Sequence, residues 1–95
     1  MTAKTKKKDD ALTPDQVSEL RAMAEEHASF VKAGNLTSLQ RDWEGRRGLE
    51  IEQDEKTGLW IARCSGIVAK SAANGREAFA NWGNKVRRIL NLYAG

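Results

Sequence analysis

The chain contains few of the residues from which disulfides, metal sites and membrane spans are built. Its 95 residues include one cysteine, one histidine and one proline, and no apolar run approaches the roughly 18 residues that cross a bilayer. The single cysteine, Cys64, excludes an intrachain disulfide and fits a reducing compartment. One cysteine with one histidine also excludes a zinc site of thiolate and imidazole ligands. Because the N-terminal stretch is charged rather than apolar, we expect a cytoplasmic protein that does not enter a membrane.

Enzymatic motifs are missing too. The sequence has no glycine-rich phosphate loop, no Gly-x-Ser-x-Gly nucleophile turn and no second histidine. His27 falls on an apolar helical stripe and Cys64 inside an expected strand, so we interpret both as core residues. Four carboxylates of one expected hairpin are interpreted as surface charge rather than as a Mg²⁺ site: Glu50, Glu52, Asp54 and Glu55. The sequence therefore predicts a protein that is not an enzyme, with no catalytic residue, cofactor or metal ion.

The N-terminal segment differs in composition from the rest of the chain. Residues 1–12 carry four lysines followed by Asp9 and Asp10, and no apolar residue able to anchor the segment occurs before Leu12. We interpret residues 1–12 as a disordered basic arm and residues 13–95 as a single domain.

A long helix is expected directly after this arm. Thr13 as N-cap, Pro14 at the first helical position and Gln16 three residues after the cap match a capping box. Apolar residues and the histidine then recur at three- and four-residue spacing: Val17, Leu20, Met23, Ala24, His27, Phe30 and Val31. The pattern predicts a helix over about residues 14–33.

A short second helix follows in the sequence. Leu36, Leu39 and Trp43 share one helical face. Thr37 and Ser38 are residue types that cap helices, so we expect one of them as the N-cap.

The chain then changes to a two-residue period, which is typical of strands. Residues 49–52 alternate apolar and acidic side chains, residues 54–58 form a turn, and residues 59–64 form the return strand. Residues 67–69 predict a brief third strand. Both faces of the return strand are apolar apart from Arg63, so the sequence leaves open which face is buried.

The last helix has the strongest pattern. Asn74 is its expected cap, and Glu77 follows three residues later, as in a capping box. Seven residues form one apolar stripe: Ala78, Phe79, Trp82, Val86, Ile89, Leu90 and Tyr93. Gly83 inside the helix costs about 1 kcal/mol relative to alanine, which indicates that another part of the chain approaches closely there. The whole order predicts an α+β fold, with a long N-terminal helix, a short second helix, a small antiparallel sheet of two or three strands and this C-terminal amphipathic helix packed on the sheet.

Charge is distributed unevenly along the chain. Residues 1–55 carry nine basic and twelve acidic side chains, whereas residues 56–95 carry seven basic and one acidic. The outer face of the last helix lacks the acidic partners of an ordinary solvated face. It is formed by Arg76, Ala80, Asn81, Asn84, Arg87, Arg88 and Asn91, with Lys85 at one edge. Arginine and asparagine form hydrogen bonds of defined geometry to phosphates and base edges.

Nucleic-acid binding with a regulatory role is therefore the first functional hypothesis. We expect five side chains to neutralise phosphates: Lys6, Lys7, Lys8, Lys85 and Arg88. We expect three others to set the register or contact base edges: Arg76, Asn84 and Arg87. A basic surface helix without a ligand is the simpler interpretation, and the sequence does not choose between DNA and RNA.

Parts of the chain resemble known small domains. Residues 56–63, followed by Arg76-Glu77-Ala78, resemble the hairpin-then-helix pattern of the arm-type DNA-binding domains of phage integrases. They are also similar to the small HicB-like antitoxin domain, in which a strand pair precedes a helix that opens with Glu-Ala. The order of elements resembles that of a double-stranded-RNA-binding domain, although the lysine pair at the start of that family's final helix is missing here. Each resemblance covers less than half of the chain, and no functional residue is carried over.

A protein-interaction module is the alternative hypothesis. Tryptophan and arginine are the side chains that most often dominate protein interfaces, and the chain has three tryptophans. The expected contact residues are Trp43, Arg46, Arg47 and Trp60. Such a module would act as an inhibitor or accessory subunit of the kind that phages and mobile elements encode. An uncovered face of the hairpin would instead form a homodimer.

Overall fold

The computed structural model describes residues 12–92. The predicted basic arm, with Lys6, Lys7 and Lys8, lies outside this range except for Leu12. The described residues form three helices and one three-stranded antiparallel sheet, in the order α2 (Pro14–Lys32), α3 (Leu36–Arg46), β1 (Glu50–Gln53), β2 (Trp60–Cys64), β3 (Ile67–Ser71) and α4 (Gly75–Asn91). The predicted α+β fold is confirmed, including its third strand. None of these helices is long and apolar enough to cross a membrane.

The start of α2 matches the sequence pattern. Thr13 Oγ1 accepts a hydrogen bond from the backbone N–H of Gln16 at 3.1 Å, and Gln16 Oε1 accepts one from the backbone N–H of Thr13 at 2.8 Å. This reciprocal pair satisfies backbone donors that the first helical turn leaves without partners. The stripe of α2 buries Leu20, Met23, Ala24 and His27, whereas Val31 near its end is exposed.

The N-cap expected for α3 is wrong. The helix begins at Leu36, so Thr37 and Ser38 both lie inside its first turn, and the N-cap residue is Asn35. Asn35 makes no capping hydrogen bond with its side chain, and its Oδ1 instead accepts a hydrogen bond from Ser38 Oγ at 2.8 Å. Because Leu36 is itself buried in the core, packing rather than a side-chain cap determines where this helix begins.

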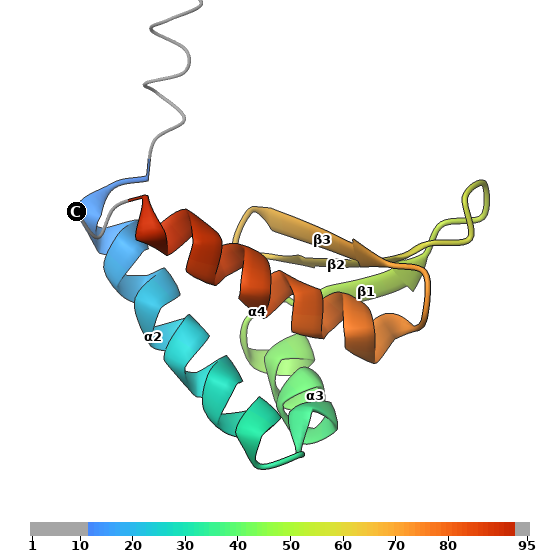
Figure 1. Cartoon of the computed structure of the whole chain (residues 1–95), viewed down its shortest axis with the longest axis horizontal. Coiled ribbons are helices and arrows are strands. Elements are labelled where there is room, and N and C mark those ends of the chain that lie inside the picture. The colour runs from blue at the N-terminus through green and yellow to red at the C-terminus, as the bar shows by residue number, and fades with distance from the viewer. Residues whose placement is uncertain (1–11, 93–95) are drawn as a thin grey trace, which may run out of the picture.

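The sheet turns one face toward the helices. Its strand order is β1-β2-β3, so β2 is central and β1 and β3 are edge strands. Ala62 and Cys64 of β2 and Ala69 of β3 are buried on the helix side, whereas Arg63 is exposed on the opposite side. This settles which face of the return strand is buried. Helix α4 crosses the sheet, α2 packs along the far side of α4, and the β1–β2 turn projects from the body of the molecule (Figure 1).

Aromatic rings fill the space between the helices and the sheet. Trp43, Phe79 and Trp82 are completely buried, and the Trp43 and Trp82 ring centroids lie 5.4 Å apart in an edge-to-face arrangement. His27 is also completely buried, with its ring 4.8 Å from that of Phe79. The ring lies so close to Gly83 that a Cβ atom there would overlap it. The predicted close approach at Gly83 is therefore confirmed, and the approaching group is the histidine.

Candidate nucleic-acid interface

Helix α4 is held in a fixed rotation by its two ends and its inner face. Asn74 Oδ1 accepts a hydrogen bond from the backbone N–H of Glu77 at 2.8 Å, which starts the helix. Five apolar residues of the predicted stripe are buried: Ala78, Phe79, Trp82, Val86 and Leu90. Ile89 is half-buried, and Tyr93 lies beyond the described residues. With this side anchored in the core, Arg76, Asn84, Arg87 and Arg88 are exposed and Lys85 is half-buried.

The basic residues of α4 are not engaged by carboxylates. The four ion pairs between residues 12 and 92 all lie elsewhere: Arg46–Glu26, Arg46–Asp42, Arg47–Glu19 and Arg63–Glu52. Arg87 Nη2 donates a hydrogen bond to Asn84 Oδ1 at 2.6 Å, which is a neutral partner. The only acidic residue of α4 is Glu77 in its first turn, where a negative charge stabilises the helix dipole. The C-terminal half of the helix therefore presents uncompensated positive charge.

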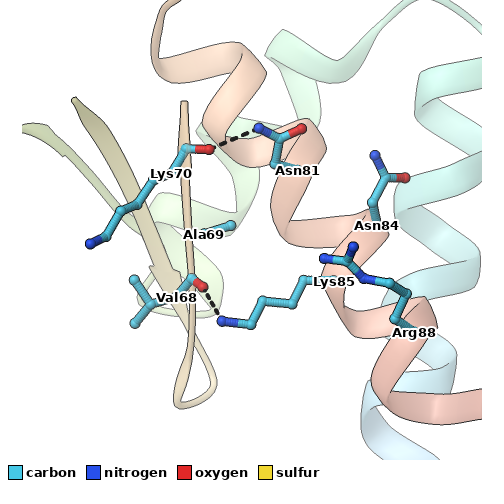
Figure 2. A pocket seen from close by; sticks show the side chains of 7 residues that line it. All are labelled: Val68, Ala69, Lys70, Asn81, Asn84, Lys85 and Arg88. Atoms are coloured by element: carbon cyan, nitrogen blue, oxygen red, sulfur yellow. Dashed lines mark hydrogen bonds between the residues drawn. The ribbon is translucent and has the colours of Figure 1, made fainter. Parts of the chain in front are cut away.

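Two side chains of α4 reach the outer edge of β3. Lys85 Nζ donates to the carbonyl oxygen of Val68 at 2.7 Å, and Asn81 Nδ2 donates to that of Lys70 at 2.8 Å (Figure 2). Because β3 is an edge strand, these carbonyl groups have no neighbouring strand to pair with. Lys85 is therefore partly committed to the strand edge, and its ammonium group keeps two further protons for a ligand.

A groove of about 530 Å³ runs between β3 and α4, and we call it the β3 groove. Its α4 wall carries Asn81, Asn84, Lys85 and Arg88, and no acidic residue lines it. The opposite wall is β3 from residue 68 to residue 70, whose lysine side chain extends away from α4 (Figure 2). Amide and cationic groups on one wall, with no carboxylate opposite, form a site that favours anions.

A second groove, of about 330 Å³, lies on the other side of α4 against α2, and we call it the α2 groove. Arg87 lines it from α4, and Arg21 and Glu25 line it from α2. A third hollow, of about 220 Å³, lies at the start of α4 and includes Arg76. The predicted set is thus distributed over three places, and only Asn84, Lys85 and Arg88 share one groove.

The predicted contact residues did not include Asn81, Lys70 or Arg21, which line these grooves. The helical period places Asn81 on the predicted outer face of α4, although the hypothesis gave it no contact role. Lys70 and Arg21 come from β3 and α2. Their proximity to α4 depends on how distant segments pack, and no local pattern in the sequence indicates it.

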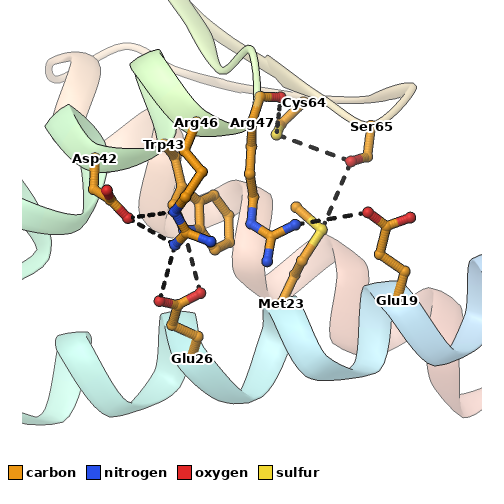
Figure 3. A network of polar contacts seen from close by, with 9 residues as sticks. All are labelled: Glu19, Met23, Glu26, Asp42, Trp43, Arg46, Arg47, Cys64 and Ser65. Atoms are coloured by element: carbon orange, nitrogen blue, oxygen red, sulfur yellow. Dashed lines mark hydrogen bonds and ion pairs between the residues drawn. The ribbon is translucent and has the colours of Figure 1, made fainter.

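Three residues of the alternative hypothesis, Trp43, Arg46 and Arg47, contact other side chains of the chain (Figure 3). Trp43 is completely buried, and its Nε1 donates to Glu26 Oε1 at 3.3 Å. Arg46 pairs with Glu26 at 3.3 Å, as well as with an aspartate of its own helix. Arg47 pairs with Glu19 and lies over the Trp43 ring, with Cζ 5.3 Å from the centroid. These contacts hold α3 against α2 and bury the Trp43 ring, whereas the Arg46 side chain remains 46% exposed.

The fourth residue of that hypothesis, Trp60, is half-buried under the start of α4. A Cβ atom at Gly75 would lie 3.4 Å from Trp60 Cε3 and 2.8 Å from Ile51 Cγ2. The glycine therefore allows the helix backbone to lie directly on these side chains. Trp60 supports the first turn of α4 rather than standing out from the hairpin.

The acidic hairpin has structural partners. Asp54 accepts hydrogen bonds from Thr57 Oγ1 at 2.8 Å and from the Lys56 backbone, and these bonds lower the pKa of its carboxyl group. Glu52 pairs with Arg63 at 2.6 Å. Across residues 12–92, no three metal-ligating side chains are grouped together.

No protein-family model, curated protein or solved structure matches this chain.

Proposed function

We propose that this chain is a small nucleic-acid-binding protein and that the exposed side of α4 is its contact surface. The observation that supports the proposal is that three arginines of α4 are exposed and have no acidic partner within residues 12–92. Arg76, Arg87 and Arg88 are exposed along one helix, and none forms an ion pair with any residue from 12 to 92. Phosphate groups are the ligands that such unpaired guanidinium groups bind best, because the two planar donors match two phosphate oxygens.

The position of the start of α2 supports a joint role for the lysine arm. Helix α2 begins at the end of the molecule where α4 ends (Figure 1). Lys6, Lys7 and Lys8 precede Leu12 by four to six residues in the sequence, and each residue spans at most about 3.5 Å. The lysines of the arm would therefore be within reach of Arg87 and Arg88 and would add contacts to phosphates beside those two residues.

The proposal is tested by charge reversal at Arg87 and Arg88. We expect the full chain to bind a short fluorescent DNA or RNA probe in low salt, with affinity falling steeply between about 50 and 200 mM salt. The Arg87→Glu/Arg88→Glu variant should bind about tenfold more weakly or worse, with a salt slope smaller by about 2. Binding is measured by fluorescence anisotropy and folding by circular dichroism.

A matched variant controls for net charge. Arg41 on α3 and Lys56 in the β1–β2 turn are exposed and have no ion pair within the described range. Arg41→Glu/Lys56→Glu changes the total charge by the same amount, yet it should weaken binding much less than the α4 variant. Absence of binding to every probe in low salt, or equal losses in the two variants, would contradict the proposal.

The contribution of the arm is separable from that of α4. Replacing Lys6, Lys7 and Lys8 by glutamine should lower the salt slope by up to about 3, because each lost phosphate contact removes about one unit. Unfolding curves should not change, because the described core contains none of these residues. An unchanged slope would show that the arm takes no part.

A further inference from the structure

Helix α4 forms a ridge between two grooves. The β3 groove, about 530 Å³, follows one side of the helix, and the α2 groove, about 330 Å³, follows the other. Lys85 and Arg88 line the first, and Arg87 lines the second. Positive side chains therefore line the grooves on both flanks of α4, with Glu25 of α2 also lining the α2 groove.

Asn84 lies between these flanks. At 100° per residue, Arg88 is rotated about 40° from Asn84 in one direction and Arg87 about 60° in the other. Asn84 is exposed, and its Oδ1 accepts the hydrogen bond from Arg87, so this bond leaves its amide N–H groups as donors for a ligand. Around the helix axis, the Asn84 amide therefore lies between the guanidinium groups of Arg88 and Arg87.

The described surface offers no stacking platform. Trp43, Phe79 and Trp82 are completely buried, and Phe30 and Trp60 are half-buried and line neither groove. Proteins that bind single strands without sequence preference stack bases on exposed aromatic rings. Between residues 12 and 92, no aromatic ring lies where a base over α4 could stack on it.

We infer that the ligand of this ridge is B-form duplex DNA, with α4 entering the major groove. This inference rests on the proposed nucleic-acid binding. A helix with its side chains is about 10–12 Å across, and the B-form major groove is about 12 Å wide. The two phosphate backbones would then lie along the two grooves of the protein, close to Lys85 and Arg88 on one side and Arg87 on the other. The Asn84 amide would face the base edges, where purine N7 is an acceptor.

The same geometry selects against the other nucleic acids. The major groove of an A-form RNA duplex is deep and too narrow for a helix. A single strand has only one backbone, so it can engage only one flank at a time. Both alternatives should therefore make fewer contacts with the ridge.

The test compares probes of one sequence and equal length by anisotropy with the full chain. These are a DNA duplex, its unpaired single strand, the corresponding RNA duplex, and the DNA duplex with bulky groups on pyrimidine C5, which project into the major groove. We expect the plain DNA duplex to bind about tenfold more tightly than each of the others. Equal or tighter binding to the single strand or the RNA duplex, or undiminished binding to the substituted duplex, would overturn the inference. Absence of binding to all four probes would instead contradict the proposed function.

The central amide is tested separately. Asn84→Asp keeps the shape of the side chain, removes its donor and adds a negative charge at the middle of the ridge. We expect it to weaken binding to the DNA duplex by about tenfold. Asn35→Asp makes the same chemical change at the exposed start of α3 and should alter binding by less than about twofold. Equal effects of the two variants would overturn the role of Asn84.

Discussion

The inner and outer faces of α4 are built on opposite principles. The inner face encloses Phe79, Trp82 and Gly83, and it packs so closely that the His27 ring lies directly on the helix backbone. The outer face carries Arg76, Asn84, Arg87 and Arg88, and little of the molecule contacts them. Changes on the inner face should therefore affect folding, and changes on the outer face should affect ligand binding with little effect on folding.

Two adjacent arginines at the C-terminal end of α3, the second of them its C-cap, extend the comparison. Arg46 and Arg47 are the same residue type as Arg87 and Arg88 and are likewise adjacent in sequence. Their charges, however, are matched by carboxylates of α2 and α3. The two pairs of adjacent arginines therefore differ in whether carboxylates within residues 12–92 form ion pairs with them.

The largest expected effect is that of Gly83→Ala. The new Cβ would overlap Cε1 and Nδ1 of the completely buried His27 ring. We expect a loss of about 2–3 kcal/mol in the free energy of unfolding, larger than the gain of about 1 kcal/mol from alanine's helix propensity. Urea denaturation of the variant and the wild-type chain measures this difference in the free energy of unfolding.

A second substitution identifies the cause. In a His27→Ala background the overlap disappears, so Gly83→Ala should then cost far less than in the wild-type chain. Equal costs in the two backgrounds would show that the histidine is not the obstacle.

Arg47→Met should have the next largest effect on stability. It removes the ion pair with Glu19 and the contact of the guanidinium with the Trp43 ring. We expect a loss of about 1–2 kcal/mol. Arg41→Met, on α3, replaces an exposed arginine without an ion pair among residues 12–92 and should change stability by less than about 0.5 kcal/mol. Equal values for the two variants would contradict the internal role of Arg47.

The course of the chain could be predicted largely from local signals. The capping box at Thr13 and the cap at Asn74 mark two helix starts, and the change to a two-residue period marks the strands. The start of α3 could not be predicted in this way. Leu36 begins that helix because the core buries it, and a neighbouring threonine or serine is a weaker influence than that burial.

The candidate site also has one part that local sequence signals predict and one part that they do not. The outer face of α4 follows from its helical period, so Arg76, Asn84, Arg87 and Arg88 could be identified from the sequence. The β3 groove could not, because it depends on β3 lying beside α4. For the residues of the protein-interaction hypothesis, the sequence did not indicate the contacts that they make within the chain. Trp43 and Arg47 resemble interface residues in the sequence, and their partners lie on a helix far away in the chain.

A smaller effect on the free energy of unfolding is expected from a change of pH, because the buried His27 packs against the inner face of α4. Burial lowers the pKa of His27 below its ordinary value of 6.5. The hydrogen bond that its Nε2 donates to the Phe79 carbonyl oxygen at 2.9 Å raises the pKa and so partly opposes this effect. The positive charge of Arg87 lowers the pKa further. Below pH 6.5 the unfolded chain binds a proton that the folded chain does not. Stability should therefore be complete above pH 6.5 and fall with decreasing pH, by at most about 1.4 kcal/mol per pH unit, until the folded histidine is protonated.

Urea denaturation between about pH 7.5 and 5.5 measures this dependence. His27→Gln should remove the slope in that window, whatever its effect on stability at neutral pH. The lowered pKa of Asp54 places its titration below 3.8, outside the window. A wild-type protein equally stable at both ends of the range would contradict a neutral, buried His27.

The smallest expected effect on stability is that of Arg88→Met, and it is the most direct test of the difference between the inner and outer faces of α4. Arg88→Met removes a charge from the outer face without removing an ion pair, because Arg88 has none with any residue in 12–92. Its attraction to the C-terminal end of the helix dipole is worth about 0.3–1 kcal/mol at low salt, and added salt screens it. We therefore expect the free energy of unfolding to change by less than about 0.5 kcal/mol at moderate salt. The contrast with Arg47→Met, made by the same substitution in the same chain, separates an arginine that stabilises the fold from one that is exposed and forms no ion pair within residues 12–92. A loss at Arg88 as large as that at Arg47 would mean that the outer face also contributes to folding, and its weaker binding variants would then need another explanation.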